Sequence, residues 1–389
     1  MDLKALILIG PPASGEAPAG TIAGVPMAYL DVLGATVLER VVQRLKAAGI
    51  SEVALISCVG RDAHAERATF NARLNLVDVD GQEFWNKAEE TFERFREEGA
   101  DLVLVSRLGP YVEVDYEELI QHHIDKHCRM TSAVDGEGQS LELFVLDAAR
   151  RSDASVLFRS GLQTVRDACE RFLVQGYVNP LQNAGDLRRL ALDGLLRKNS
   201  IAPLGTEIRP GVWVGERAHI HPKARVLAPA FIGAHGKIRA SALLTRNSVI
   251  EHHAEIDCGT VVENSTVLPF TYVGAGLDVM HALVGFRRFF HLPRKVEVEI
   301  SDSKLIGMSA IRPLSRTLGS AAALFAVLPQ QMYRAISGRP HGIQGAKLLA
   351  SLGAPAATSG NPVGEQPASG QEEEDFPSNF AVVRRYGQH

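Results

Sequence analysis

Three sets of residues in the sequence are of types that could bind a ligand or move a proton. The neighbouring histidines His252 and His253 could act as general bases, because imidazole exchanges a proton near neutral pH. The stretch Gly10–Gly24 is rich in glycine and has one charged residue, Glu16. Arg107 follows an apolar run that predicts a strand, and a substrate phosphate could lie beyond the end of that strand. These residues are the candidates for chemistry.

A further group suggests metal binding. His122, His123, His127 and Cys128 fall in one predicted helix, and His123 and His127 have the i, i+4 spacing that can bind zinc. The sequence has no HExxH motif and offers no obvious third ligand, and a polar helix surface would show the same residues. We therefore expect no metal site here.

An aliphatic residue recurs at every sixth position through residues 208–268. The series is Ile208, Val214, Ile220, Val226, Ile232, Ile238, Leu244, Ile250, Ile256, Val262 and Leu268. A period of six fits neither a helix nor an ordinary strand, but it fits a triangular coil with three short strands per turn. The pattern resembles the left-handed β-helix of hexapeptide-repeat proteins, and we expect that fold over residues 201–310. A break at Gly274 predicts a loop over residues 274–295.

The same resemblance gives the paired histidines a possible role. Hexapeptide-repeat acyltransferases use a coil histidine as a general base toward an acceptor hydroxyl or amine. His252 and His253 lie near a predicted corner of the coil, and His219, His221 and His235 are similar candidates. A solvated turn histidine is the alternative interpretation of each.

Strands and helices alternate before the repeat. Apolar runs predict strands over 4–10, 52–57, 101–105 and 141–146, and helical spacing predicts helices over 36–48, 83–98 and 115–127. Such alternation is typical of an open, mostly parallel α/β sheet with helices on both faces, which we expect over residues 1–200. These sheets bind ligands beyond the carboxyl ends of their strands, and Gly10–Gly24 follows the first strand.

The motifs of this region carry a family resemblance. KALILIG leads into the glycine-rich stretch, GVPMAYLDVLG and VLERVVQRLKAAGISEVALIS follow, and Gly176-Tyr177-Val178-Asn179-Pro180-Leu181 comes later. With a hexapeptide repeat behind it, the chain resembles sugar-phosphate nucleotidylyltransferases of the GDP-mannose or ADP-glucose pyrophosphorylase kind. In that family a sugar 1-phosphate attacks the α-phosphorus of a nucleoside triphosphate. The resemblance implies nucleotide binding by Gly10, Ser14, Gly15, Gly20, Thr21 and Arg107.

The charged groups that this reaction needs are not matched. The family uses a Gly-Thr-Arg element, a lysine in a Pro-Lys element and two aspartates that bind Mg²⁺. Here no arginine or lysine occurs between Ala5 and Glu39, and Pro26-Met27 stands at the lysine element. Ser106-Arg107-Leu108 and Val178-Asn179-Pro180 stand where the aspartates would be. Mg²⁺ is expected only if the domain is active.

The net charge and the C-terminal residues 311–389 bear on the partners and the location of the protein. A net charge of −4 argues against nucleic-acid binding. Residues 314–336, within a helical segment 311–351, could lie on a membrane surface, dock a partner or cap the coil, and residues 352–389 are expected to be a disordered tail. The ending FAVVRRYGQH is apolar enough for a short docking motif. We expect a cytoplasmic protein without a transmembrane segment, assembled as a homo-oligomer or with a paralogue.

The leading hypothesis is a nucleotidyltransferase-family protein of sugar-nucleotide metabolism whose catalytic site has degenerated. Such a pseudoenzyme would bind a nucleotide sugar, or regulate an active paralogue, in polysaccharide or cell-envelope precursor synthesis. Two alternatives stay open, namely an active sugar-1-phosphate nucleotidylyltransferase and a hexapeptide-repeat acyltransferase. Whether the chain is an enzyme is therefore undecided from sequence.

Overall fold

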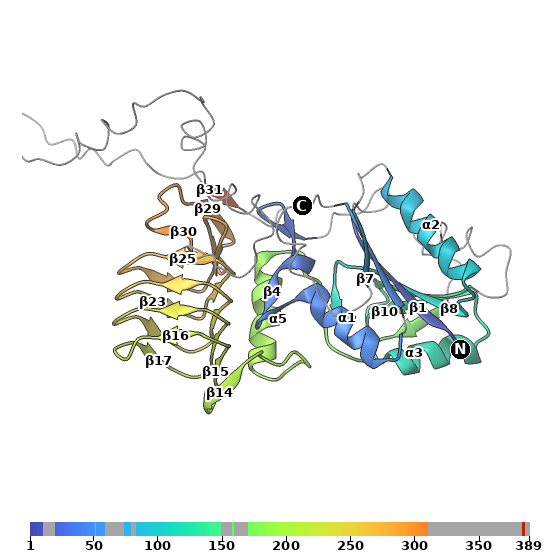
Figure 1. The fold of residues 1–389 in the computed structure, drawn as a ribbon, viewed down its shortest axis with the longest axis horizontal. Coiled ribbons are helices and arrows are strands. Elements are labelled where there is room, and N and C mark those ends of the chain that lie inside the picture. Colours follow the sequence, from blue (N-terminus) through green and yellow to red (C-terminus); the bar gives the residue numbers. More distant parts are fainter. Residues whose placement is uncertain are drawn as a thin grey trace, which may run out of the picture. The chain divides into compact units, whose positions relative to one another are not determined.

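Figure 1 shows the computed structural model of the chain. The structure describes residues 1–10, 20–50, 52–58, 74–78, 83–148, 158, 170–309 and 383–385. Within these ranges no helix is both long and apolar enough to cross a membrane. The segment 311–351, including 314–336, lies outside the described residues, as does the expected tail 352–389 except for residues 383–385.

The first half of the chain builds a mixed α/β sheet. Within the described part it has seven strands in the order β12-β10-β11-β8-β1-β6-β7 (Figure 1). The strands are β1 (Leu3–Ile9), β6 (Glu52–Ser57), β7 (Leu74–Asp78), β8 (Leu102–Arg107), β10 (Met130–Val134), β11 (Ser140–Asp147) and β12 (Glu170–Leu173). Every neighbouring pair is parallel except those of β11, which runs antiparallel to β8 and β10. The predicted α/β class is confirmed.

Helices cover both faces of this sheet. They are α1 (Val37–Ala47), α2 (Phe84–Glu97), α3 (Tyr116–Asp125) and α5 (Ala184–Leu195). Alternate residues of β1 divide between two cores, because successive side chains of a strand point to opposite faces. Ile7 packs in the core that contains residues of α1, α3 and α5, whereas Leu6 and Leu8 pack with Phe84 and Phe92 of α2. A strand buried on both sides needs the continuous apolar run that the sequence shows.

Local signals set the element boundaries. Thr36 caps α1 by accepting a hydrogen bond from the Glu39 amide at 3.1 Å, and the Glu39 carboxylate accepts one from the Thr36 amide, which forms a capping box. Gly49, just beyond the helix, has φ = 79°, a conformation that glycine adopts without steric cost. The strand predicted over 52–57 is confirmed as β6, and each predicted helix ends within two residues of the observed one.

Short elements connect the sheet to the second half of the chain. They are β2 (Thr21–Ile22), β3 (Val25–Pro26), the 3₁₀ helix η1 (Met27–Tyr29), β4 (Asp31–Val32), β5 (Ala35–Thr36), β9 (Tyr111–Val112) and β13 (Val178–Asn179). Three two-stranded antiparallel pairs result, β2 with β3, β4 with β5, and β9 with β13. The last pair brings the 176–181 motif beside the segment that follows β8.

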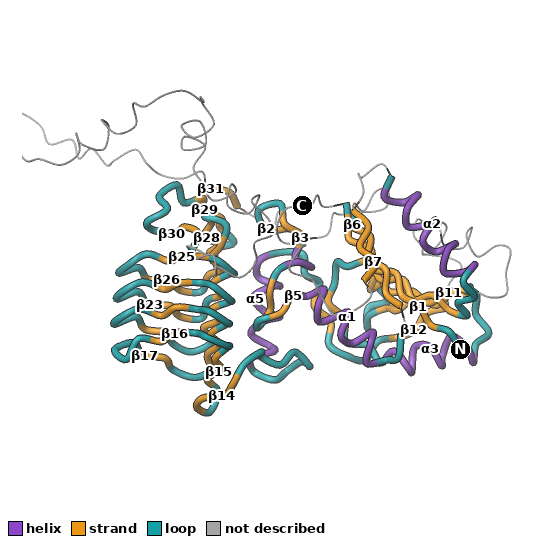
Figure 2. The backbone as a smooth tube through the Cα atoms, in the orientation of Figure 1, coloured by secondary structure: helices purple, strands orange, loops and turns teal. Residues whose placement is uncertain are grey.

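The second half of the chain is built from three sheets that the chain visits in turn (Figure 2). The first contains β14 (Thr206–Arg209), β15 (Val212–Val214), β18 (Ala230–Ile232), β21 (Ser248–Ile250), β24 (Thr266–Val267), β27 (Ala282–Gly285), β28 (Arg288–His291), β29 (Val296–Glu299) and β31 (Val383–Arg385). The second contains β16 (His219–Ile220), β19 (Lys237–Ile238), β22 (Glu255–Ile256), β25 (Thr271–Val273) and β30 (Ile306–Met308). The third contains β17 (Arg225–Val226), β20 (Leu243–Leu244), β23 (Val261–Glu263) and β26 (Asp278–Met280).

The register of these sheets is compatible with a β-helix. Val212 pairs in parallel with Ala230, 18 positions later, as three hexads per turn require. Ile232, Ile238 and Leu244 each lie fully buried in one shared core. The hexad pattern therefore predicts the inward positions of the central turns correctly.

The register shortens by one residue between Val262 and Val267. Val249 pairs with Thr266, 17 positions later, so Val267 takes the inward position that the strict period assigns to Leu268. Leu268 instead packs in the core that contains Ile7 of the α/β sheet. The prediction for Leu268 is wrong, because the step between the inward residues Val262 and Val267 has five residues where the repeat has six. Ile208, at the start of the series, is half exposed and not inward.

The structure also differs from the expected loop over residues 274–295. Strands β26 and β27 continue the coil there by pairing in parallel with β23 and β24. Beyond them β28 and β29 form antiparallel pairs that extend the first sheet. The loop interpretation failed because the shortened turn displaced the aliphatic series by one position.

The outer face of the first coil sheet shares a core with the α/β region. Phe231, Val249 and Leu283 lie fully buried in the same cluster as residues of β1, α1 and α5. Arg188 of α5 is 4% exposed, and its guanidinium donates to Thr266 Oγ1 and Asn264 Oδ1 at 3.1 Å each and to the Asn247 carbonyl. Apolar burial and buried hydrogen bonds therefore join the two halves.

Candidate functional site

The strand order of the α/β sheet reverses between β1 and β8. After β1 the chain continues into β6 on one side of it, and β8 lies on its other side next to β11. The connections that follow β1 and β8 therefore run in opposite directions across the sheet. Open α/β sheets bind ligands in the crevice outside the carboxyl ends of two such strands. Gly10 directly follows β1 and Arg107 ends β8. The structure thus brings two of the predicted nucleotide-binding residues to one edge of the sheet.

The glycines of this edge are close to other chain segments. A Cβ added to Gly10 would lie 2.4 Å from the Phe84 ring, and a Cβ on Gly20 would lie 2.2 Å from the Leu181 carbonyl oxygen. Gly20 therefore permits the approach of the 176–181 motif, and its small size has a packing reason. Thr21 is exposed in β2, whereas Ser14 and Gly15 lie outside the described residues.

Arg107 has partners within the protein. Its Nη1 lies 3.0 Å from Glu142 Oε2, and its guanidinium carbon lies 5.8 Å from the centre of the Trp85 ring. The side chain is 14% exposed. A bound phosphate would compete with Glu142 for this charge.

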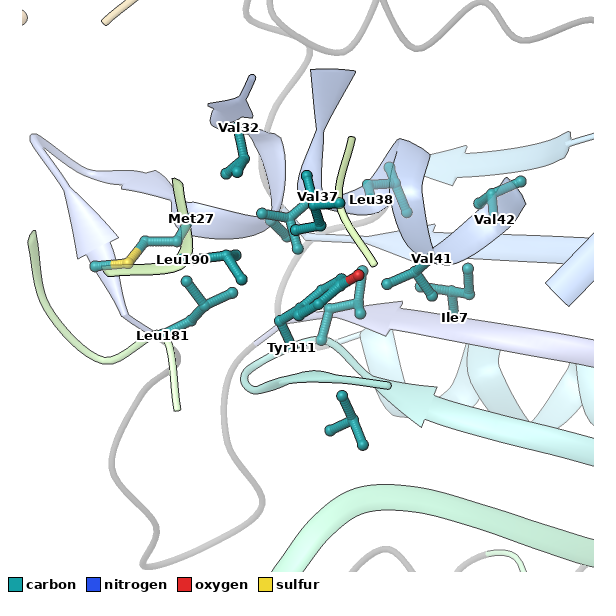
Figure 3. Packing of buried hydrophobic residues seen from close by; sticks show 14 of the residues in the cluster. Ile7, Met27, Val32, Val37, Leu38, Val41, Val42, Tyr111, Leu181 and Leu190 are labelled. Carbon is teal, nitrogen blue, oxygen red and sulfur yellow. The ribbon is translucent and has the colours of Figure 1, made fainter. Parts of the chain in front are cut away.

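The position of the expected lysine is part of the hydrophobic core. Met27 is 2% exposed and packs among Leu181 and Leu190, as Figure 3 shows. A charged lysine could not occupy this cluster without losing its hydration, which costs several kcal/mol by the order of magnitude known for buried ions. A cation at this position is therefore incompatible with the observed packing.

Neither expected aspartate position offers a carboxylate. Ser106 is buried in β8, and Asn179 is 1% exposed in β13. Mg²⁺ prefers carboxylate and phosphate oxygens in octahedral geometry. Among the described residues no group of three or more His, Cys, Asp or Glu side chains could hold a metal ion. The donor set of this edge does not fit Mg²⁺.

Asn179 has a structural role that depends on its amide. Its Nδ2 donates to the Asp186 carbonyl at 3.0 Å and to Tyr177 Oη at 3.4 Å, and its Oδ1 accepts from the Leu181 amide at 3.0 Å. Asn179→Asp would replace the donor with an oxygen that faces another carbonyl. We expect the variant to lose about 1–3 kcal/mol of unfolding free energy, the cost of unsatisfied buried polar groups.

Urea unfolding measures this loss. Gln182→Glu, the same chemical change at a neighbouring exposed position, is the control and should change stability by less than about 0.5 kcal/mol. An Asn179→Asp variant that kept full stability and gained Mg²⁺-dependent nucleotidyl transfer would contradict this structural role.

The second candidate region contains His252 and the loop after η1. His252 Nδ1 forms a short contact with the Asp31 carboxylate, which is buried in β4. A carboxylate at Nδ1 fixes the orientation of an imidazole, as in general-base dyads. Of the two predicted histidines, His252 has this partner.

The adjacent Glu251 is fully buried and joins the same two segments. Its Oε1 accepts from the Leu33 amide at 2.8 Å, and its Oε2 accepts from the Gly34 amide at 2.9 Å. Burial is the largest cause that raises the pKa of Glu251 to about 8, and the negative charge of Asp31 adds to it. The two backbone amides and Arg40 oppose this shift, because they favour the ionised form. Arg40 donates to the Val32 and Leu33 carbonyls at 3.2 and 3.0 Å, and burial lowers its pKa. We call Asp31, Arg40, Glu251 and His252 the junction cluster.

His253 lies in a column of rings along one corner of the coil. Its ring stacks on His235 and on Phe270, with centroid distances of 4.6 and 4.8 Å. All three residues have φ = 57°, the left-handed conformation of a tight corner. This stacking explains His253 as a corner residue.

The histidines of α3 have separate environments. His123 is 2% exposed and its Nδ1 lies 2.8 Å from Thr131 Oγ1, whereas His122 Nε2 lies 3.6 Å from a Glu170 carboxylate oxygen. Burial lowers the pKa of His123, which favours the neutral form. The structure therefore gives His123 a core position.

Sequence reasoning missed Asp31, Arg40 and Glu251. Asp31 lies in the GVPMAYLDVLG motif and Arg40 in the VLERVVQRLKAAGISEVALIS motif, and no feature of either motif separates these residues from their neighbours. Glu251 occupies the polar position after the inward Ile250. A charged residue beside a corner of the coil is ordinary where that corner faces solvent. The sequence does not show which face of the coil the α/β region covers, and therefore does not show that Glu251 is buried.

No protein-family model matches the chain, and no curated protein is significantly similar to it. The function proposed below therefore depends on the fold, on the junction cluster and on the sheet edge beyond the carboxyl ends of β1 and β8. We call this edge, where the strand order reverses, the switch point.

Proposed function

We propose that the chain is a member of the sugar-phosphate nucleotidylyltransferase family with a degenerate catalytic site, followed by a left-handed β-helix. It binds a nucleotide or a nucleotide sugar at the switch point between β1 and β8, and it acts as a binding or regulatory subunit in sugar-nucleotide metabolism. The switch point itself supports binding. The buried Met27 at the lysine position is the observation that carries the loss of catalysis.

Charge at the switch point supports the same proposal. Transfer to an α-phosphorus requires cations on the transferring group and a metal held by carboxylates. Ser106 and Asn179 supply no carboxylate at the two expected positions, and Arg107 is already paired with Glu142. Binding needs less than catalysis, because backbone amides and one arginine can hold a diphosphate.

Calorimetric titration with a panel of nucleotide sugars, combined with a pyrophosphate-release assay, tests this function. We expect binding without turnover when triphosphates, sugar 1-phosphates and Mg²⁺ are supplied. Arg107→Ala should weaken binding about tenfold or more, the effect of one charged hydrogen bond, whereas the exposed Arg217→Ala should not change it. Robust pyrophosphate release would show the active enzyme instead, and the absence of binding to every nucleotide sugar would contradict the proposal.

A second candidate function is acyl transfer by the coil. The contact of Asp31 with His252 Nδ1 favours it, because this arrangement suits a general base. The test is consumption of an acyl-CoA in the presence of sugar or amine acceptors. Activity lost in His252→Ala and kept in His253→Ala would establish this function over the first.

A further inference from the structure

The first coil sheet ends in a strand from a distant part of the sequence. β29 pairs with β28 on one side and with β31 on the other, and residues 310–382 separate β31 from the rest of the described chain (Figure 1). Val298 lies opposite Val383, and Glu297 lies opposite Arg384. Three residues of the sequence FAVVRRYGQH, Val383–Arg385, thus form the strand that pairs with the edge of β29.

The residue types on the two strands are complementary. β29 alternates valine and glutamate over Val296–Glu299, and β31 consists of one valine and two arginines. Opposite charges and paired apolar residues across an antiparallel ladder each contribute about 0.2–1 kcal/mol. Arg288 of β28 also forms an ion pair with Glu297. A basic, partly apolar extended segment fits the edge of β29 better than an acidic one.

The pairing is short enough to be reversible. Three residues of β31 pair with β29, which is fewer than the typical strand of about 5–6 residues. The connection through residues 310–382 is long, and the entropy of closing a loop rises only slowly with its length. A tethered segment reaches an effective concentration on the order of millimolar at short spacings and less at long ones. The tether therefore favours docking within one chain without making it permanent.

We propose that the edge of β29 is a strand-docking site and that residues 383–385 of the same chain are its resident, displaceable occupant. When this segment leaves, the edge exposes unpaired N–H and C=O groups, which bind any extended segment of the same chemistry. The site is separate from the switch point and from the junction cluster, so the proposal does not depend on the proposed function.

A labelled peptide with the sequence of residues 380–389 tests the proposal on the full chain. Val383→Asp combined with Arg384→Glu removes the apolar pair and reverses the charge opposite Glu297. We expect this double variant to bind the peptide at least about tenfold more tightly than the unchanged chain, whose own segment competes for the edge. Gln388→Glu, which adds negative charge outside residues 383–385, is the control and should leave peptide binding at the unchanged level.

Hydrogen exchange supplies a second measurement. The amides of β31 should be protected in the unchanged chain and should lose that protection in the double variant, with protection elsewhere retained. Equal peptide binding by all three chains would overturn the proposal. A folded double variant that does not bind the peptide would also overturn the proposal. Protection of β31 that appears only when the chain dimerises would do the same, because the occupant would then come from a second copy.

Discussion

Replacing Glu251 with alanine should be among the most damaging single substitutions in the second half of the chain. The carboxylate accepts from two buried amides, Leu33 N and Gly34 N, and both would lose their partner. Unsatisfied buried donors cost about 1–3 kcal/mol each, so we expect a loss of about 3–5 kcal/mol once the small cavity is included.

The isosteric variant separates hydrogen bonding from size. Glu251→Gln keeps one acceptor, but its amide nitrogen must face a backbone N–H, and we expect a loss of about 1–3 kcal/mol. Urea unfolding at fixed pH measures both variants. Glu216→Ala, on an exposed turn of the same coil, is the control and should stay within about 0.5 kcal/mol of the unchanged chain. A Glu251→Ala variant as stable as this control would show that the two amides find other partners.

Much of the fold could be predicted from the sequence, because its signals are local. The buried run that forms β1, the capping box of α1 and the hexads around Ile232–Leu244 each specify their own neighbourhood. The one-residue shortening between Val262 and Val267 could not be predicted, because Val267 and Leu268 are both aliphatic and either could point inward. Only the position of the neighbouring α/β segment distinguishes them.

The candidate sites were predictable to a smaller degree. Gly10 and Arg107 follow strands that a parallel sheet brings to the same edge, so their placement could be inferred from the alternation of elements. The junction cluster could not, since Asp31 and His252 are 221 positions apart and no periodicity connects them. Its existence depends on the register of the coil against the α/β region, which is a tertiary property.

The same cluster should make stability depend on pH. Burial raises the pKa of Glu251 from its usual 4.5 to about 8, with Asp31 adding to the shift and Arg40 opposing it. Between these values the folded chain keeps a proton that the unfolded chain has released. The contribution of Glu251 to stability is therefore full below about pH 4.5 and is lost as the pH rises toward 8, with a limiting slope of about 1.4 kcal/mol per pH unit for one proton. Glu39, whose pKa is also raised by burial, acts in the same direction.

The thermal midpoint between pH 5 and 8.5 measures this dependence. Glu251→Gln cannot ionise, so its midpoint, although lower, should fall distinctly less over this range than that of the unchanged chain. Glu98→Gln is the matched control, because a hydrogen bond from Lys4 lowers the pKa of Glu98 and its contribution is lost only as the pH falls below the usual range. Equal slopes for the unchanged chain and Glu251→Gln would mean that Glu251 is ionised throughout. The two backbone amides and Arg40 would then outweigh burial and the charge of Asp31.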